Sequence, residues 1–381
     1  MQHHSVWLVL CFISGCAIPA STSGARAEDT GASLVAEGAA LFHRVWAPND
    51  PRSIDGDGLG PMYNADSCVA CHVGGGGAAG IDRNVTLIDG GVLHRYSLDQ
   101  QYETFRVEQL ERAKPVMVNP GCMVLIQPGE LTRSDRNTPA LWGVGLLESI
   151  PVEAIEANVS TDSEGISGRM SVDADGEPGR LGWKGDIGRV DAFVREACSN
   201  ELGLTVPDAT QAEPPGLDMS ASELRALTRY VQTLPAPQRD GEHLIGRAAF
   251  EQLGCAGCHM ERLGPVSGLY SDLLLHDMGD ELDGAGGSYG ARREDVMVLG
   301  EGTGPAGSRE WRTPPLWGVA DTAPYLHDGR AATLVDAIQH HGGEAYAARM
   351  AWHNATPEVQ GAVLVFLNGL RAPVAAPPDP S

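Results

Sequence analysis

Two identical patterns of cysteine and histidine stand out as residues that could do chemistry. One pattern consists of Cys68, Cys71 and His72, and the other of Cys255, Cys258 and His259. This Cys-x-x-Cys-His spacing is typical of covalent c-type haem attachment, in which two thiols bind the vinyl groups and the histidine binds the iron. A zinc site would need four converging ligands, and a dithiol redox pair gives no reason for the histidine to recur. The sequence therefore predicts two covalently bound c-type haems.

Two further cysteines, Cys122 and Cys198, lie between the two motifs. In an oxidising compartment such a pair favours a disulfide, so we expect these two residues to be linked. The alternative is that both are buried thiols.

The first 27 residues have the pattern of an export signal. Residues 6–18 form an apolar run that is too short to cross a bilayer, and Ala25-Arg26-Ala27 offers a cleavage site before Glu28. Alternatively, Ile13-Ser14-Gly15-Cys16 is similar to a bacterial lipoprotein box, which would leave Cys16 lipidated. Both interpretations predict an exported protein, periplasmic and either free or lipid-anchored.

The elements that must position the two motifs occur twice along the chain, in the same order. Each unit has a helical pattern before the haem motif, then a Thr-Pro-x-Leu-Trp-Gly segment, then a closing amphipathic helix. These segments are 34–46, 137–143 and 220–234 in the first unit, and 244–253, 312–318 and 356–370 in the second. Ser220 and Glu223 are spaced as a capping box, and Thr356-Pro357 is typical of a helix start.

This repetition predicts a mainly α fold made of two tandem cytochrome c-like domains with long irregular loop insertions. We expect a leader over residues 1–27, or a lipoprotein leader to Cys16. An N-terminal haem domain over 28–236, a C-terminal haem domain over 240–371 and a disordered tail over 372–381 follow.

Charge and composition limit the classes of molecule that this protein could bind. The 381 residues carry a net charge of −23 and only two lysines, Lys114 and Lys184, which argues against a nucleic-acid partner. A basic protein is a more natural partner for such an acidic chain. No segment after the leader reaches eighteen uninterrupted apolar residues, so we expect no transmembrane helix.

Four segments carry a resemblance to a known family. They are Asp57–Pro61, Tyr270–Gly279, Thr322–Gly329 and His341–Ala345. In these segments the chain resembles the di-haem oxidoreductases related to bacterial di-haem cytochrome c peroxidases and MauG-like enzymes. The resemblance implies a peroxidase or peroxide-dependent oxidase, in which hydrogen peroxide reacts at the N-terminal haem and electrons pass through the C-terminal haem. The alternative is a di-haem electron-transfer protein without catalysis.

The resemblance also implies which residues lie on the second side of each haem. In the relatives the distal ligand of the second haem follows the His-Asp-Gly histidine by fourteen residues, which from His327 gives His341. Met278 is the alternative ligand. No comparable residue is marked for the first haem, although His94, Met117 and Met123 lie within plausible reach. We therefore expect the first haem to have a vacant or weakly held distal side.

A carboxylate that moves a proton between the peroxide oxygens is the remaining catalytic requirement. Glu148 lies in the apolar segment Leu146–Ile150 and is the candidate, with Glu153 in reserve. The alternative is that Glu148 is a structural carboxylate at a helix start.

The relatives also bind a calcium ion between the haems, through an Asn side chain and two backbone carbonyls. The matching positions are Asn137, Thr322 and Pro324, and all-oxygen ligation suits calcium.

One position departs from the pattern of the peroxidases. Their first domain carries Trp-Asp-Gly at the tryptophan that relays electrons between the haems, and this chain has Pro151-Val152-Glu153 there. Trp142 or Trp317 could substitute for the relay, or both could serve packing alone.

Overall fold

The structure is a computed structural model that describes eleven stretches of the chain. They are residues 23–60, 63–77, 81–87, 92–93, 116–119, 122–124, 131–159, 165–173, 176–209, 216–284 and 306–374. Within them the protein is mostly helical with little sheet, as expected from the sequence. None of the helices in these stretches is both long enough and apolar enough to span a membrane.

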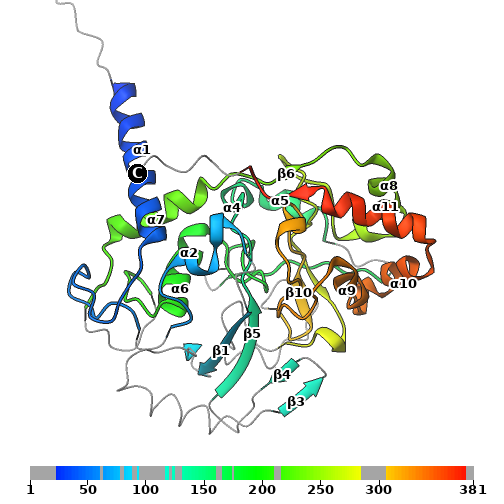
Figure 1. Cartoon of the computed structure of the whole chain (residues 1–381), viewed down its shortest axis with the longest axis horizontal. Coiled ribbons are helices and arrows are strands. Elements are labelled where there is room, and N and C mark those ends of the chain that lie inside the picture. Colours follow the sequence, from blue (N-terminus) through cyan, green and yellow to red (C-terminus); the bar gives the residue numbers. More distant parts are fainter. Residues whose placement is uncertain are drawn as a thin grey trace, which may run out of the picture.

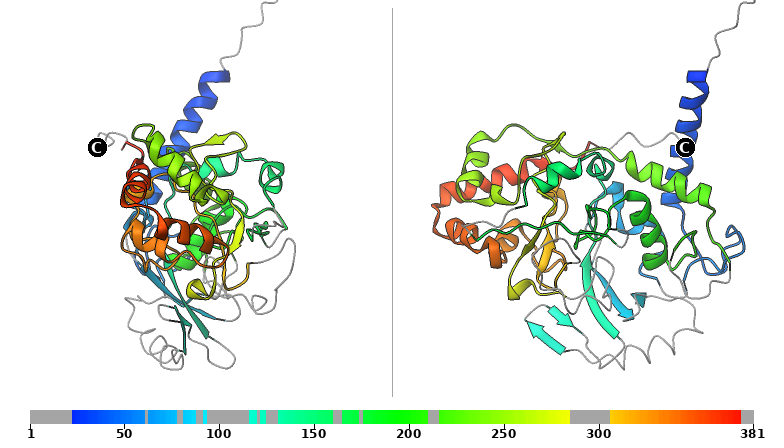
Figure 2. Two further views of the ribbon diagram at one scale, coloured as in Figure 1. Left: turned by 90° about the vertical axis from the view of Figure 1, so that its right-hand side faces the viewer. Right: turned by 180° about the vertical axis from the view of Figure 1, so that it is seen from behind.

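Ten α-helices are described. They are α1 (Ser23–His43), α2 (Cys68–Cys71), α4 (Val144–Leu147), α5 (Val152–Glu156), α6 (Val190–Glu201), α7 (Ala221–Gln232), α8 (Leu244–Gln252), α9 (Leu334–Gln339), α10 (Tyr346–Asn354) and α11 (Pro357–Asn368). Elements α1, α2, α6 and α7 lie at one end of the molecule, and α8 to α11 lie at the other (Figures 1 and 2).

The strands are short and pair antiparallel. They are β1 (Ile81–Leu87), β2 (Val92–Leu93), β3 (Val116–Asn119), β4 (Cys122–Val124), β5 (Leu131–Asn137), β6 (Gln238–Arg239), β7 (Arg262–Leu263), β8 (Val266–Ser267), β9 (Leu275–Asp277), β10 (Glu310–Arg312) and β11 (Leu370–Arg371). The largest sheet has the order β2-β1-β5, with Ile81 opposite Asn137. This sheet lies within the long insertion of the first unit, where the sequence predicts only irregular loops.

The predicted helix starts are confirmed at two of these helices. Ser220 caps α7 and forms the predicted capping box with Glu223. Thr356 caps α11, with Pro357 at the first helical position. The capping box and the Thr-Pro helix start each depend on residues within one helical turn, so both can be recognised from the sequence alone.

Two helix pairs cross closely, one in each half of the chain. In α1, a Cβ on Gly38 would lie 2.0 Å from the carbonyl oxygen of Ala226 in α7. In α8, a Cβ on Gly246 would lie 2.1 Å from the carbonyl oxygen of Ala362 in α11. Each pair can therefore cross at this distance only because a glycine stands at the contact.

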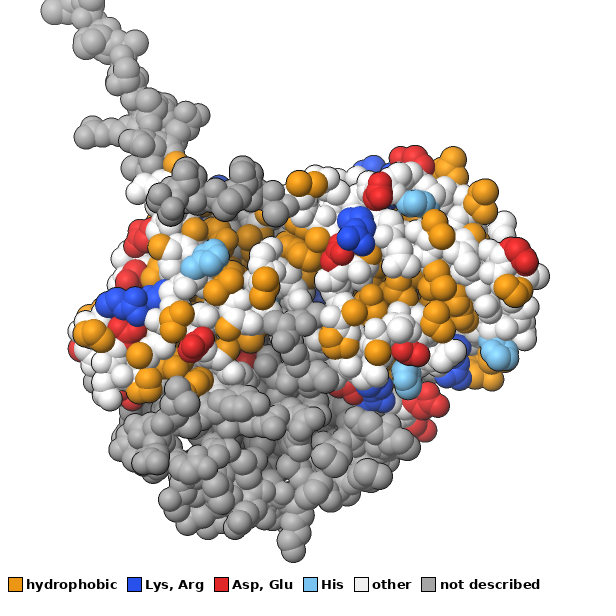
Figure 3. All heavy atoms as spheres, viewed as in Figure 1, with side chains coloured by type: hydrophobic (Ala, Val, Ile, Leu, Met, Phe, Trp, Pro, Cys, Tyr) orange, Lys and Arg blue, Asp and Glu red, His pale blue; other side chains and the backbone are white. Residues whose placement is uncertain are grey.

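Each helix pair belongs to its own hydrophobic core. The first core includes Phe42, Leu227 and Val231, and the second includes Phe250, Val363 and Phe366. Trp317 comes from the second half of the sequence but packs in the first core, which connects the two halves. On the face shown in Figure 3, hydrophobic side chains are exposed over both halves.

Candidate functional site

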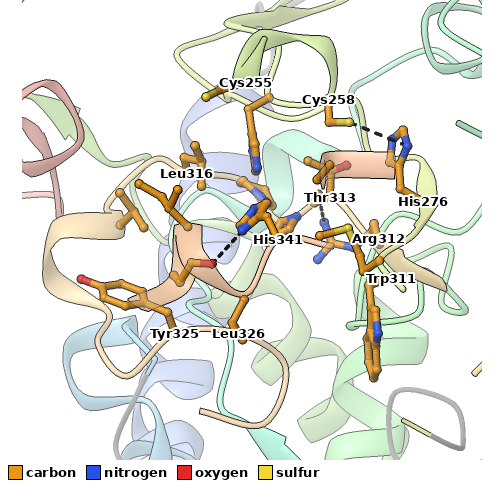
Figure 4. A pocket seen from close by; sticks show the side chains of 18 of the residues that line it. Cys255, Cys258, His276, Trp311, Arg312, Thr313, Leu316, Tyr325, Leu326 and His341 are labelled. Atoms are coloured by element: carbon orange, nitrogen blue, oxygen red, sulfur yellow. Dashed lines mark hydrogen bonds between the residues drawn. The ribbon is translucent and has the colours of Figure 1, made fainter. Parts of the chain in front are cut away.

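A cavity of about 560 Å³ lies against the second Cys-x-x-Cys-His motif. This volume is within the range of cofactor pockets, roughly 300–1,000 Å³. Cys255, Cys258, His259 and His341 all line it, so the structure brings the predicted attachment residues and the predicted distal ligand together. Figure 4 shows both cysteines and His341 around the same space. Met278, the alternative ligand, also lines the cavity.

The rings of His259 and His341 lie at a separation that suits two ligands of one metal ion. Their ring centres are 6.4 Å apart. Two imidazoles that bind one metal ion have ring centres roughly 6.2 Å apart, because each metal–nitrogen bond is about 2 Å long. Nδ1 of His259 donates to the Tyr270 carbonyl at 3.0 Å, and Nδ1 of His341 donates to the Ala337 carbonyl at 2.7 Å. Nε2 of each ring is thereby left as the nitrogen to bind metal.

Burial keeps these imidazoles neutral, the form that binds metal. It lowers the pKa of His259 to about 4 and also lowers the pKa of His341. Phe250 packs on His259, with ring centres 6.3 Å apart, so the α8–α11 pair supports the motif histidine directly.

The first motif repeats these features. His72 follows α2, and its Nδ1 donates to the Gly76 carbonyl at 2.9 Å. Burial lowers the pKa of His72 to about 4, and Phe42 of α1 packs on its ring at 6.5 Å between centres. Of the described residues that line the 560 Å³ cavity, none belongs to the first motif.

Residues proposed for the distal side of the first haem lie outside what the structure describes. This holds for His94 and for the side chains of Met117 and Met123. Their roles stay as predictions from the sequence.

Glu148 contacts helices and not the cavity. One of its carboxylate oxygens accepts from the backbone N–H of Val190 at 2.8 Å, and the other accepts from Nε2 of Gln232 at 2.7 Å. Val190 is the first residue of α6, so Glu148 stabilises the start of this helix. These contacts favour the structural alternative, and the catalytic role stays an untested prediction. Glu153, the reserve, lies in the first turn of α5.

The proposed calcium ligands come partly together. Nδ2 of Asn137 donates to the Pro324 carbonyl at 2.6 Å, and its Oδ1 is buried without a hydrogen-bond partner. An amide oxygen left in this way fits a cation site, and all-oxygen ligation suits calcium. Thr322 ends the short 3-10 helix Val319–Asp321.

Cys198 is a buried free thiol on α6. The side chain of Cys122 lies outside the described residues. The disulfide and the alternative of two buried thiols both stay predictions.

Part of the chain matches a known protein family. Residues 212–370 match the family model described as "Di-haem oxidoreductase, putative peroxidase". Hydrazine synthase subunit gamma of Kuenenia stuttgartiensis is 28% identical over 146 residues, which cover 32% of this chain. The match spans 41% of that relative, less than half of its length.

Three solved structures are similar to this chain at a low level, each with a TM-score below 0.5. Hydrazine synthase of Kuenenia stuttgartiensis is 15% identical, with a TM-score of 0.44 over 96% of this chain and 100% of that chain. The diheme peroxidase BthA of Burkholderia thailandensis is 14% identical, with a TM-score of 0.40 over 89% of this chain and 86% of that chain. A MauG-like protein associated with microbial copper homeostasis is 17% identical, with a TM-score of 0.33 over 58% of this chain and 89% of that chain.

The structure also shows buried ionisable side chains that the sequence does not reveal. His276 lies between Asp272 and Glu344 with its side chain only 3% exposed. The segments that carry these residues, Tyr270–Gly279 and His341–Ala345, are two of those on which the family resemblance rests. The sequence nevertheless gives no sign that the three side chains meet.

Lys184, one of the two lysines, is also buried beside the cavity. Its Nζ donates to three backbone carbonyls within residues 307–310 at 2.8–3.0 Å and lies 3.5 Å from the centre of the Trp311 ring. Trp311 in turn stacks on His327 at 3.6 Å between ring centres. Burial lowers the pKa of Lys184.

The two repeated tryptophans connect the halves of the chain. A Cβ on Gly318 would lie 2.9 Å from the Trp142 ring, and a Cβ on Gly143 would lie 3.0 Å from the Trp317 ring. Nε1 of Trp142 also donates to the Gly74 carbonyl at 2.8 Å, just beyond the first motif. Trp142 and Trp317 both line the cavity.

Proposed function

We propose that this chain is an exported di-haem c-type cytochrome that acts as a peroxidase or a peroxide-dependent oxidase. Peroxide reacts on the side of the first motif, and electrons pass through the second. The observation that carries the proposal is the His259–His341 pair, with ring centres 6.4 Å apart beside Cys255 and Cys258 in one cavity. The family match of residues 212–370 supports the same reading.

The residues of the second site have separate roles in this proposal. Cys255 and Cys258 would hold the haem covalently, and His259 and His341 would be the ligands of its iron. Backbone carbonyls fix both imidazole rings, so little reorientation is needed for binding. When bound, the haem supplies the electron-transfer chemistry of this site.

The first site has the same attachment residues without an assigned distal ligand. Cys68 and Cys71 would hold the haem, and His72 would be a ligand of its iron. Peroxide binding requires a ligand position of the iron that the protein does not fill. Glu148 is kept as the acid/base candidate, although its hydrogen bonds to Val190 and Gln232 favour a structural role.

The rest of the proposal concerns the region between the two haem sites, the cellular location and the partner protein. Asn137, Thr322 and Pro324 would hold one calcium ion, and the Trp142–Trp317 contact is the candidate electron path. In this proposal residues 1–27 are an export leader and the protein acts in the periplasm, either free or lipid-anchored through Cys16. There a basic protein would suit a chain of net charge −23 as electron donor or oxidised substrate.

The alternative function is electron transfer without catalysis. Its supporting observation is Glu148, whose oxygens are both engaged by α6 and α7.

The spin state of each ferric haem distinguishes the two functions. We expect electron paramagnetic resonance of the haem-loaded protein to show one low-spin haem, from His259 and His341, and one high-spin haem at the first site. Two low-spin haems that do not react with peroxide would establish the electron-transfer alternative.

A further inference from the structure

The carboxylate–imidazole–carboxylate group formed by Asp272, His276 and Glu344 lies at the edge of the second site. Asp272 precedes β9, His276 is in the middle of β9, and Glu344 is on the short 3-10 helix Gly343–Ala345. Nε2 of His276 contacts the Asp272 carboxylate at 2.9 Å, and its Nδ1 contacts the Glu344 carboxylate at 2.8 Å. Nδ1 is also 3.7 Å from Sγ of Cys258, a contact drawn in Figure 4.

The two acidic neighbours of the His276 imidazole favour its charged form. Burial by itself would lower the pKa of His276, but its hydrogen bonds to Asp272, Cys258 and Glu344 outweigh burial and raise it to about 12. Burial by itself would raise the pKa of Glu344, but its hydrogen bonds to His276 and to the backbone N–H groups of Ser167 and Asp277 together outweigh burial and lower it. The two acidic side chains thus favour an imidazolium between them, and the group has little access to water.

Glu344 joins three separate parts of the chain. Besides His276, it accepts from the backbone N–H of Asp277 at 3.1 Å in β9. It also accepts from the backbone N–H of Ser167 at 2.7 Å and from the Ser167 hydroxyl at 2.9 Å. Glu344 follows His341 by three residues, so these bonds act on the segment that carries the distal ligand.

The residues between His341 and Glu344 lie directly against β9. Gly343 has φ +49°, and a Cβ there would lie 2.0 Å from the Asp277 carbonyl oxygen. The backbone of the segment can approach β9 this closely only through glycine. Its position is thus set by the glycine contact and by the bonds of Glu344.

Such an arrangement is costly for stability alone. Burying two carboxylates and an imidazolium sacrifices hydration, and apolar residues often stabilise a core equally well. Buried ionic groups do specify a single arrangement in some proteins. The arrangement that this group specifies is the distance between residues 341–345 and β9.

We propose that Asp272, His276 and Glu344 are positioning residues that hold His341 within binding distance of the second haem iron. This inference rests on the proposed function, because it takes His341 as the distal ligand. Without these bonds, the segment would be free to withdraw His341 from the iron.

A metal ion is the competing use of these side chains. Ligand atoms of Cys258, Asp272 and His276 lie within 4.8 Å of one another. In the proposed function Cys258 is bonded to haem, and both nitrogens of His276 contact carboxylates. These contacts favour the positioning role.

The test compares Glu344→Ala with Glu251→Ala, an exposed acid of α8, in the haem-loaded full chain. We expect Glu344→Ala to keep two haems by intact mass while the second haem gains a high-spin fraction. The reduction potential of the second haem should shift as well, because one of its ligands is lost in part of the molecules. A tenfold change in a one-electron equilibrium corresponds to roughly 59 mV. Added imidazole should restore the low-spin spectrum, because it replaces the withdrawn side chain. Glu251→Ala should match the wild type.

Ser167→Ala is the second variant, for the case that Glu344→Ala does not fold. It removes only one hydrogen bond to Glu344, and Ser167 is exposed, so we expect this variant to fold. We expect a smaller high-spin fraction of the same kind. The positioning role would be overturned if the second haem of Glu344→Ala stays fully low-spin with an unchanged reduction potential. If Ser167→Ala is the only variant that folds, the same result in Ser167→Ala would overturn it. If His341→Gly also leaves the second haem unchanged, the ligand assignment itself is wrong, which separates failure of the proposed function from failure of this inference.

Discussion

The glycine at the α8–α11 crossing offers a quantitative test of how the helices support the second site. In Gly246→Ala the new Cβ would lie 2.1 Å from the Ala362 carbonyl oxygen, whereas ordinary contact begins at 3.4 Å. The obstacle is backbone, so no side chain can turn away, and the helices must separate by about 1 Å. Overpacking of this kind costs about 1–3 kcal/mol in the free energy of unfolding.

Gly361→Ala is the matched control, because it makes the same change in α11 at a position where the Cβ meets nothing within 4 Å. There alanine should raise the free energy of unfolding by about 0.8–1 kcal/mol through its helix propensity. At roughly 2–4 °C per kcal/mol, we expect Gly246→Ala to lower Tm by about 2–12 °C and Gly361→Ala to raise it slightly.

Thermal unfolding of the haem-loaded protein, followed by circular dichroism and by haem absorbance, measures both variants. The absorbance should also change in Gly246→Ala, because Phe250 on α8 contacts His259. Equal Tm values for the two variants would refute the close crossing as a determinant of stability.

Three further predictions concern the haems. Cys68→Ser and Cys255→Ser should each lower the stoichiometry from two haems to one by intact mass, and two haems in either variant would contradict the attachment site. His341→Gly should convert the second haem from low to high spin without loss of haem, whereas an unshifted low-spin spectrum would favour Met278 as the ligand. If Glu148 is the acid/base, Glu148→Gln should slow the peroxide reaction in stopped-flow assays by roughly 10²–10⁴. A wild-type rate with a lower Tm would assign Glu148 to the start of α6.

Features set by neighbouring residues could be predicted from the sequence. The capping box of Ser220 and Glu223 and the Thr356-Pro357 helix start depend on one turn of chain, and both occur in the structure. The 14-residue spacing to His341 also identified a residue that the fold brings to His259, because the intervening segment folds locally into α9.

Features set by tertiary contacts could not be predicted. Asp272 and Glu344 meet at His276 although 72 residues separate them in the chain. The apolar neighbours of Glu148 suggested a buried acid, but they carry no information about which way its carboxylate faces. Its partners, Val190 and Gln232, lie 42 and 84 residues away. The β1–β5 pairing was missed for the same reason.

The reciprocal packing of the two repeated Trp-Gly pairs has a consequence for how the two halves of the chain assemble. Trp142 packs on Gly318 while Trp317 packs on Gly143, so the contact has the reciprocal form of a twofold homodimer interface. Because both partners belong to one polypeptide, their encounter is intramolecular and its effective concentration is fixed by the connecting chain. The docking of the two halves is therefore independent of dilution, which a dimer of separate subunits could not achieve.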